Sequence, residues 1–506
     1  PPMILAALII GHITINAVPM FDPKEASHGS FYRGANILHV QTRTALLRSF
    51  LLFHEGDEYK PPTLAETERN LRQLDFLKTV SVKASEPHDG VVDVAVVTQD
   101  AWTTDVNGDF SNDGGIAAYD FDVTQKDLLG TGSELELHLD HGVERNANKI
   151  EFLHPAAIGP YWNLDTLYSR NSDGDEQKFA LDRPLFSYET GWTASFLFDH
   201  LLRDARYFSD GQVAARFRQE HRQFVVERSH VLHADEWGSS RLSGGLDFLS
   251  DEFAPLPSRP NDAIPDARRF HFLQAGYDLT GFHYVKLNYV DRDLREQDFN
   301  LGHSLSIRLG ISPRDRSTKS TLAMLRASDS AGHAFSDHAF LLGRIDIYSR
   351  APRQRNTTIS AEVRFVQRFE TSFPQAFVSR VRVDHGWQLD RDSQFLADGQ
   401  NGLRAYPDFA FEGRQRVLIN FEQRLFLGRE ILQIFAPSLA AFADSGQAFD
   451  RNFNFSRMKT DAGLGLRIAM SRFESALLRI DYAYALNDSP ISRRGHVWSI
   501  STVHAF

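Results

Sequence analysis

Alternation of apolar and polar side chains with a period of two dominates the chain from Trp102 onward. Residues 134–140 are a clear example, with leucine at every second position and charged or polar side chains between. The same pattern recurs at 118–124, 304–311, 359–365, 463–470 and 478–485. Successive side chains of a β-strand point to opposite faces, so this period predicts strands with one apolar and one polar face.

Alternation alone does not separate a soluble β-sandwich from a membrane barrel, because the apolar face avoids water in both. Its persistence over residues 101–506, without a convincing long helix, favours the barrel. A barrel also satisfies its backbone within the sheet and leaves no free edges. We therefore predict a mainly β protein in which residues 101–506 form a transmembrane antiparallel β-barrel.

Residues 1–100 mix strand-like and helix-like patterns of apolar residues, which predicts one small α/β domain. Residues 9–18 alternate like a strand, and 42–52 have a helical pattern. Thr63 and Glu66 have the spacing of a capping box, which predicts a second helix from Thr63 to about residue 74. Strands are predicted at 80–84 and 91–97, on either side of a turn at 88–90.

Two other stretches of this region are distinctive. Residues 1–10 are apolar but lack a basic segment before them, which favours a mature chain that has lost its signal. Residues 22–38, rich in glycine, serine and histidine, lengthen the connection after the first strand.

Composition narrows the class of protein. The chain has 506 residues and no cysteine, which excludes thiol catalysis, cysteine metal sites and disulfides. The net charge is −11 and the pI is about 6.0, so no nucleic-acid partner is expected. Mean hydropathy is −0.34, and no apolar run approaches the length of a membrane helix. Membrane strands remain compatible with these values, because they alternate.

Motifs of enzyme chemistry are absent from the sequence. It contains no Gly-x-Ser-x-Gly elbow, His-Glu-x-x-His pair or phosphate-binding loop. The acidic run at 171–176 lacks the spacing of an EF-hand and favours an exposed hairpin loop. The 20 histidines show no ligand spacing. We predict a protein that is not an enzyme and that has no cofactor and no metal.

One constellation near the C-terminus joins a loop arginine to two strand acids. The loop at 401–407 contains Arg404, and residues 417–426 form a predicted strand whose polar face carries Glu422. Asp444 lies in the next predicted strand. Charges inside strands suit a polar lumen, although an ordinary arginine-containing loop with unrelated strand charges is the alternative.

Leu403-Arg404-Ala405-Tyr406 resembles the Val/Leu-Arg-Gly-Tyr/Phe lid-lock motif of the BamA/TamA superfamily of outer-membrane barrels. This superfamily, which includes the bacterial surface antigen family, is related to two-partner secretion transporters. The resemblance implies that Arg404 and Tyr406 belong to an extracellular loop, and that Arg404 meets Glu422 and Asp444 in the lumen. Ala405 replaces the family glycine, so a turn that needs positive φ would be strained.

Two further stretches resemble the same superfamily. The family turn between the second and third barrel strands, Asn-Leu-Leu-Gly-Thr-Gly, is matched by Asp127, Leu128, Leu129, Gly130, Thr131 and Gly132. Asp127 replaces the asparagine. The final strand, with Trp498, Ile500 and Phe506, looks like the C-terminal β-signal read by the assembly machinery.

The N-terminal domain resembles a periplasmic POTRA domain in its element order and in residues 53–57 and 68–76; a small α/β domain of unrelated origin is the alternative. The family barrel has sixteen strands. We count roughly twenty alternating runs and assign the excess, between 190 and 390, to hairpins that project from extracellular loops. We expect strand 80–84, with Val80 and Val82, to be an exposed sheet edge beside helix 42–52 that docks clients.

The resemblance implies a protein of the Gram-negative outer membrane that inserts or translocates client polypeptides. Its expected partners are outer-membrane lipid and lipopolysaccharide, and unfolded client polypeptides or envelope partner proteins. Two alternatives stay open on the same scaffold: a passive pore or surface receptor, and a structural subunit of a larger envelope complex.

Overall fold

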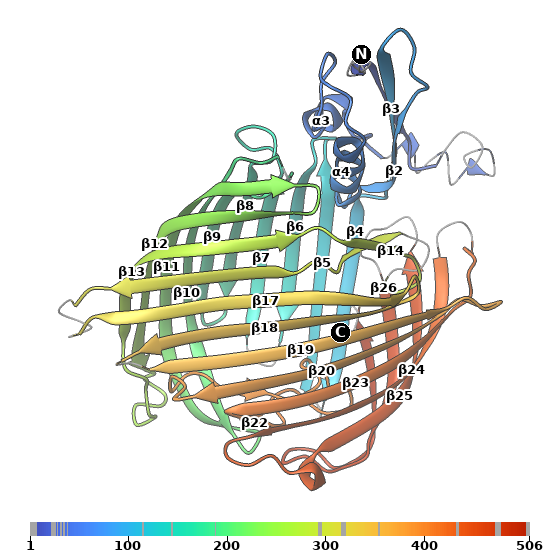
Figure 1. The fold of residues 1–506 in the computed structure, drawn as a ribbon. Helices are drawn as coiled ribbons and strands as arrows, with labels where there is room; N and C mark the ends of the chain where they lie inside the picture. The colour runs from blue at the N-terminus through green and yellow to red at the C-terminus, as the bar shows by residue number, and fades with distance from the viewer. Residues whose placement is uncertain are drawn as a thin grey trace.

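A computed structural model gives the architecture of the chain (Figure 1). It describes residues 8–21, 27, 29, 30, 33, 36, 37, 39–113, 116–142, 145–187, 189–291, 296–314, 320–352, 355–431, 435–470 and 477–501. Most of the loop at 22–38 lies outside these residues. Within it, the Asn36 side chain donates to the Phe21 carbonyl and accepts from the Phe21 amide, at 2.7 and 3.0 Å.

The N-terminal domain is a three-stranded sheet covered by helices. Its elements are β1 Ile9–Val18, α3 Thr44–Ser49, α4 Pro61–Arg72, β2 Leu77–Ala84 and β3 Val91–Asp100. The strand order is β1-β3-β2, with β1 parallel and β2 antiparallel to β3. Its buried core includes Ile10, Ile13, Leu47, Phe53, Leu64, Leu71, Val94 and Val96. The element order is the predicted one.

Helix α4 begins earlier than predicted, so the capping box is wrong. The N-cap is Lys60, and Pro61 and Pro62 open the helix. Proline suits the first helical positions because the amides there lack partners in any case. Thr63 therefore lies within the first turn, and its carbonyl accepts the Thr67 hydroxyl at 2.8 Å.

The rest of the chain forms one antiparallel sheet of twenty strands that curls into a barrel (Figure 1). The strands are β4 Thr104–Asp113, β5 Ile116–Leu128, β6 Ser133–His141, β7 Asn146–His154, β8 Asn163–Asn171, β9 Gly174–Arg183, β10 Trp192–Ser209, β11 Gln212–Asp235, β12 Gly238–Pro255, β13 Arg268–Gly281, β16 Ser304–Ser312, β17 Leu322–Ser336, β18 Ala339–Ala351, β19 Asn356–Phe369, β20 Gln375–Trp387, β23 Gln415–Phe426, β24 Phe435–Phe449, β25 Lys459–Met470, β26 Leu477–Ala485 and β27 His496–Ser501. Three minor elements lie between them: the hairpin β14 Tyr284–Leu287 with β15 Gln297–Asn300, the pair β21 Phe395–Leu396 with β22 Glu412–Gly413, and the short helix η1 Phe455–Arg457.

The expectation of sixteen strands is wrong. The additional runs between 190 and 390 pair within the main sheet, and they include its longest strand, β11, with 24 residues. Within the described part of this region, only β14–β15 forms a separate hairpin. Period-two alternation was therefore a better guide to strand number than the family figure.

The two ends of the sheet meet at β27 and β4. Only one registered residue pair, Ile500 with Phe110, joins these strands in the described part of the chain. Neighbouring strands elsewhere share longer ladders, such as the twelve pairs between β23 and β24. We call the β27–β4 junction the seam.

The outer face of the sheet is apolar and the inner face is polar. Exposed side chains on the strands include Tyr119, Phe121, Leu137, Leu139, Ile150, Tyr168, Phe179, Phe198, Leu246, Phe248, Leu309, Ile311, Val381, Phe421, Leu464 and Trp498. Buried inward side chains include Asp247, Asp278, Asp384, Asn420, Glu422, Arg424, Asp444, Asp461, Arg467 and Asp481. None of the helices that the structure describes has the length and apolar character needed to cross a bilayer.

The N-terminal domain contacts the barrel rim around Tyr161, in the loop between β7 and β8. The Tyr161 hydroxyl donates to the Phe50 carbonyl at 2.5 Å, and its ring stacks on Phe186 with centroids 3.9 Å apart. Asn70 of α4 donates to the Phe186 carbonyl at 2.5 Å. Burial raises the pKa of Tyr161, which keeps the hydroxyl a neutral donor. Domain and barrel thus share a desolvated aromatic contact.

Candidate functional site

Residues 388–414, which we call the lid loop, connect β20 to β23. Strands alternate in direction from β4, so this loop enters the barrel at the end opposite to the N-terminal domain. Its middle folds inward, where Leu403, Ala405 and Tyr406 are at most 3% exposed. They pack against side chains of the barrel wall that include Leu418 and Phe442.

Arg404 lies at the centre of the buried part of the lid loop and contacts both predicted acids. Its Nη1 donates to Glu422 Oε2 at 2.6 Å. Nε and Nη2 donate to the two oxygens of Asp444 at 2.7 and 3.0 Å. The guanidinium carbon also lies 3.6 Å from the centre of the Phe442 ring. The contact that the motif implies is therefore present, and it is bidentate toward Asp444.

Further charges surround this group. Glu422 Oε1 accepts from Arg424 Nε at 2.9 Å, and Asp481 pairs with Arg467. Burial alone would lower the pKa of Arg404, but Asp444 and Glu422 outweigh it and raise that pKa, so the arginine stays charged. Such a buried network fixes geometry more than it adds stability, and it becomes costly when one partner is removed.

Two neighbours hold the loop backbone around Arg404. The Asn420 amide donates to the Gly402 carbonyl at 2.7 Å and to Asp444 Oδ1 at 2.8 Å. The Tyr406 hydroxyl donates to the Thr460 carbonyl at 2.9 Å, and burial raises the pKa of Tyr406 to about 12. Both predicted loop residues, Arg404 and Tyr406, are thus fixed to the barrel wall.

The expected strain at Ala405 is absent. Positive φ falls instead on Gly402, at 111°, where an added Cβ would lie 2.8 Å from the Arg380 side chain. Ala405 is 2% exposed and packs into the apolar cluster of the lid loop. The position of this turn that requires glycine is therefore Gly402, three residues before the position expected from the motif.

The turn between β5 and β6, residues 127–132, docks the N-terminal domain. Asp127 Oδ1 accepts from the Gly132 amide at 2.5 Å, and Oδ2 accepts from the Thr42 hydroxyl at 2.8 Å. Positive φ occurs at Leu129, Gly130 and Gly132. A Cβ on Gly132 would lie 2.8 Å from Leu46, so both the backbone conformation and the close approach require glycine. Leu128 ends β5, and the Thr131 hydroxyl donates to its carbonyl at 2.7 Å.

The last strand presents its aromatic side chain outward. Trp498 is 64% exposed and Ile500 is 39% exposed on the outer face of β27. Trp498 lies beside Tyr482 of β26, with ring centroids 4.6 Å apart. Phe506, the third residue of the predicted β-signal, lies outside the described residues.

Strand β2 is an edge of the N-terminal sheet, as expected, but its neighbour is α4 rather than the helix at 42–52. Val80 and Val82 pair with Thr98 and Val96 of β3. The Val82 amide faces the outer edge and donates to Glu68 Oε2 of α4 at 2.9 Å. Any extended chain that pairs with this edge through the Val82 amide would therefore have to displace Glu68.

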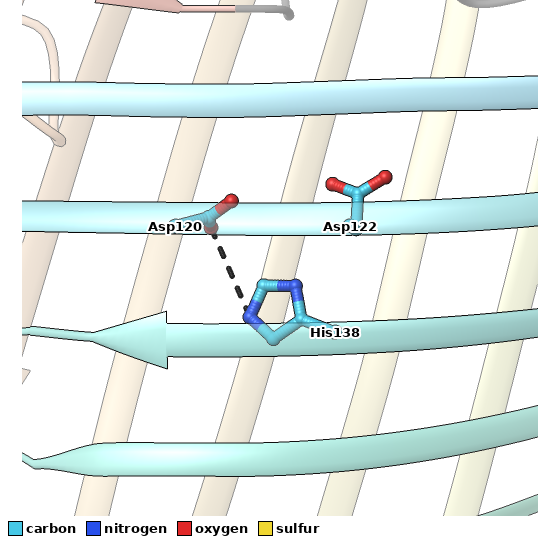
Figure 2. A group of neighbouring side chains, drawn as sticks. All are labelled: Asp120, Asp122 and His138. Atoms are coloured by element: carbon cyan, nitrogen blue, oxygen red, sulfur yellow. Dashed lines mark ion pairs between the residues drawn. The ribbon is translucent and has the colours of Figure 1, made fainter.

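The structure also brings together a lumen-facing group that sequence spacing did not reveal (Figure 2). Asp120 and Asp122 of β5 lie next to His138 of β6, with one potential ligand atom from each within 4.8 Å of the others. His138 Nε2 lies 3.8 Å from Asp120 Oδ2. The only sequence signal is strand parity, because Asp122 is the registered partner of His138.

The lumen retains a polar cavity of about 610 Å³ on the side of β10–β19. Glu227, Gln274, Arg308, Arg344 and Asp346 are among its lining residues. Arg308 pairs with Glu227 at 2.6 Å and with Asp278 at 3.0 Å. The lid loop also reaches this side of the barrel, where Asp392 pairs with Arg268 of β13 and the Phe409 ring stacks on Phe208 of β10.

Comparison with known proteins finds similarity in structure alone. No family model matches the sequence, and no curated protein matches it. CdiB from Escherichia coli aligns with a TM-score of 0.50 at 13% identity, over 98% of this chain and 76% of that one. CdiB from Acinetobacter baumannii aligns with a TM-score of 0.49 at 14% identity, over 98% of this chain and 74% of that one.

BamA from Haemophilus ducreyi, solved without POTRA domains 1–3, gives a TM-score of 0.40 at 12% identity, over 97% of this chain and 84% of that one. Of these three, the Escherichia coli protein is the one whose TM-score reaches 0.50. The chain thus shares its fold with CdiB from Escherichia coli, a large antiparallel β-barrel sheet preceded here by a small α/β domain.

Proposed function

We propose that this protein is an outer-membrane barrel of the BamA/TamA type that inserts or translocates client polypeptides. In this proposal the seam closes the barrel within the membrane. The N-terminal domain is a periplasmic POTRA domain that receives the client or an envelope partner. Exposed apolar side chains on the outer face support contact with lipid and lipopolysaccharide.

The observation that carries the proposal is the Arg404 site. A loop from the end opposite to the N-terminal domain enters the lumen and is held there by Glu422 and Asp444. A loop that fills the lumen permanently would need no buried ion pairs to hold it, since apolar packing would be equally stable. A loop held by buried ion pairs suits a barrel that changes state while it handles a client.

A passive pore is the second candidate, and the polar lumen cavity supports it. The cavity of about 610 Å³ is lined by arginine and acidic side chains, as expected of a water-filled path for small solutes. The two candidates differ in whether the N-terminal domain is needed.

Membrane placement is the first expected result. The chain should fractionate with outer membranes and migrate differently on gels before and after heating, because a closed barrel resists unfolding by detergent. Recovery of a soluble monomer without detergent would contradict the proposal.

The client function is tested by removing residues 1–98, which leaves every barrel strand in place. We expect the barrel to remain heat-modifiable, while depletion of the full-length protein and rescue with the truncated chain leave specific proteins missing from the outer membrane or the medium. A proteomic survey of both fractions measures this loss. Full rescue by the truncated chain, with unchanged conductance, would favour the passive pore.

A further inference from the structure

The β14–β15 hairpin turns into the barrel at the end that faces the N-terminal domain. It connects β13 to β16, and its apolar side chains Leu287 and Val290 pack with Leu301. Their partners are Phe340, Val366 and Val378 of β18, β19 and β20. Val378 shares a strand face with the lumen residue Asp384, so the hairpin lies against the inner wall.

At its base, the hairpin is bound to helix α4 of the N-terminal domain. Arg72 Nε donates to Asp298 Oδ2 of β15 at 2.9 Å, and its Nη1 donates to Glu68 Oε1 at 3.0 Å. The guanidinium of Arg69 lies 4.3 Å from the centre of the Tyr284 ring. Arg72 and Asp298 are each only 10% exposed, so water screens their pair weakly.

At its inner end, the hairpin is bound to the wall beneath the lid loop. Asp291 Oδ1 accepts from Arg424 Nη1 at 3.0 Å and also pairs with Arg364. The same Arg424 nitrogen donates to the Val290 carbonyl at 2.8 Å. Across the hairpin, the Asp291 amide donates to Gln297 Oε1 at 3.1 Å, next to Asp298. Base and inner end are thus joined by direct contacts.

The contacts continue from the hairpin into the Arg404 site. Arg424 binds Asp291 through Nη1 and Glu422 Oε1 through Nε, at 3.0 and 2.9 Å. The other oxygen of Glu422 accepts from Arg404 at 2.6 Å. Arg424 and Glu422 are at most 2% exposed. A shift of Asp291 therefore removes one of the groups that hold Arg424, which in turn binds the carboxylate that holds the lid loop.

The first contact of this series lies at the edge of β2. Glu68 Oε2 accepts the Val82 amide, while Glu68 Oε1 accepts from Arg72. An extended chain that pairs with β2 must take the Val82 amide for its own carbonyl. Glu68 then loses the Val82 amide and keeps only its cationic partners, Arg72 and Lys286 of β14, so its position beside Arg72 is less constrained.

We propose that the β14–β15 hairpin transmits pairing of an extended polypeptide at the β2 edge to the lid loop, through the carboxylates of Glu68, Asp298 and Asp291. The proposal rests on the client dock assigned above to the N-terminal domain. It makes Asp291 and Asp298 positioning residues of the lid, although neither contacts it.

The test uses one buried lid residue as a reporter. Ala410 is 0% exposed and the native chain has no cysteine, so Ala410→Cys gives a single thiol that reacts with maleimide only when the lid loop leaves the lumen. In the reconstituted full chain, Asp291→Asn, Asp298→Asn and Glu68→Gln should each raise the labelling rate about tenfold, the scale of one hydrogen bond to a charged group. A short synthetic peptide of alternating valine and threonine should raise the rate in the chain that carries only Ala410→Cys.

Asp346→Asn is the matched control, since it removes a lumen carboxylate that pairs with Arg344 away from the hairpin. Its labelling rate should not change. Heat-modifiable migration confirms that each variant is folded, and Arg404→Ala gives the rate of a released lid. The proposal is overturned if Asp298→Asn and Glu68→Gln label no faster than the control, or if the peptide has no effect. Failure of the client function appears separately, as full rescue by the chain without residues 1–98.

Discussion

Arg404→Ala is expected to give a folded barrel whose lid loop is no longer held in the lumen. The substitution leaves Glu422 and Asp444 facing one another without the cation between them. Breaking one side of a buried ion pair costs about 3 to 5 kcal/mol. The lid should become accessible to protease added from the outside, and the activity that depends on the lid should be lost.

Three variants distinguish loss of the Arg404 ion pairs from the loss of any charged side chain in the lumen. Arg404→Lys keeps the charge but not the bidentate geometry. The protease accessibility of its lid loop should therefore lie between that of the wild type and that of Arg404→Ala. Arg404→Ala combined with Asp444→Asn removes one unpaired acid and should restore part of the protection. Arg344→Ala breaks an ion pair with Asp346 that is exposed on both sides, and should behave as wild type. Equal protection of the lid in all variants would refute the assignment.

Tyr161→Ala is expected to release the N-terminal domain from the rim while the barrel stays intact. Tyr161 is 9% exposed, stacks on Phe186, and meets Phe50 edge-on with ring centroids 5.1 Å apart. Truncation of a buried aromatic side chain to alanine costs about 3 to 5 kcal/mol. Limited proteolysis should then cut the connection near residues 101–103 faster than in the wild-type protein.

Tyr161→Phe is the control for this interface. It removes the hydroxyl, and with it the bond to the Phe50 carbonyl, and keeps both ring contacts. A single hydrogen bond contributes about 1 kcal/mol, so cleavage should rise much less than in Tyr161→Ala. If both variants resist cleavage as well as the wild type, the aromatic contact does not hold the domain.

The Arg404 group was predictable because each part of it follows from a simple rule. Strand parity places Asn420, Glu422 and Arg424 on one face, and the loop motif supplies the arginine. The hairpin β14–β15 was not predictable in the same way. Its strands have four residues each, and their pattern is that of any short barrel strand. What distinguishes it is the direction in which it folds, and that depends on contacts with residues far away in sequence.

Two of the predictions failed for different reasons. Thr63 and Glu66 have capping-box spacing, but Pro61 already sets the backbone angle that starts a helix, so the local signal two residues earlier prevails. The strand number failed because it was taken from the family, although the alternation itself pointed to about twenty runs. Glu68 at the β2 edge shows a third limit, since a side chain that covers an amide in another element leaves no pattern in the sequence.

The seam bears on the order in which the barrel assembles. Elsewhere in the sheet, neighbouring barrel strands follow one another along the chain, with only the minor pairs β14–β15 and β21–β22 inserted between two of them, so a hairpin-by-hairpin process forms the sheet with little loss of loop entropy. The pair between Phe110 and Ile500 joins residues 390 apart (500 − 110). Contacts of such long range form slowly and late. The nascent sheet therefore exists for a time as an open ribbon, whose first and last strands must both be shielded from other chains until they find one another.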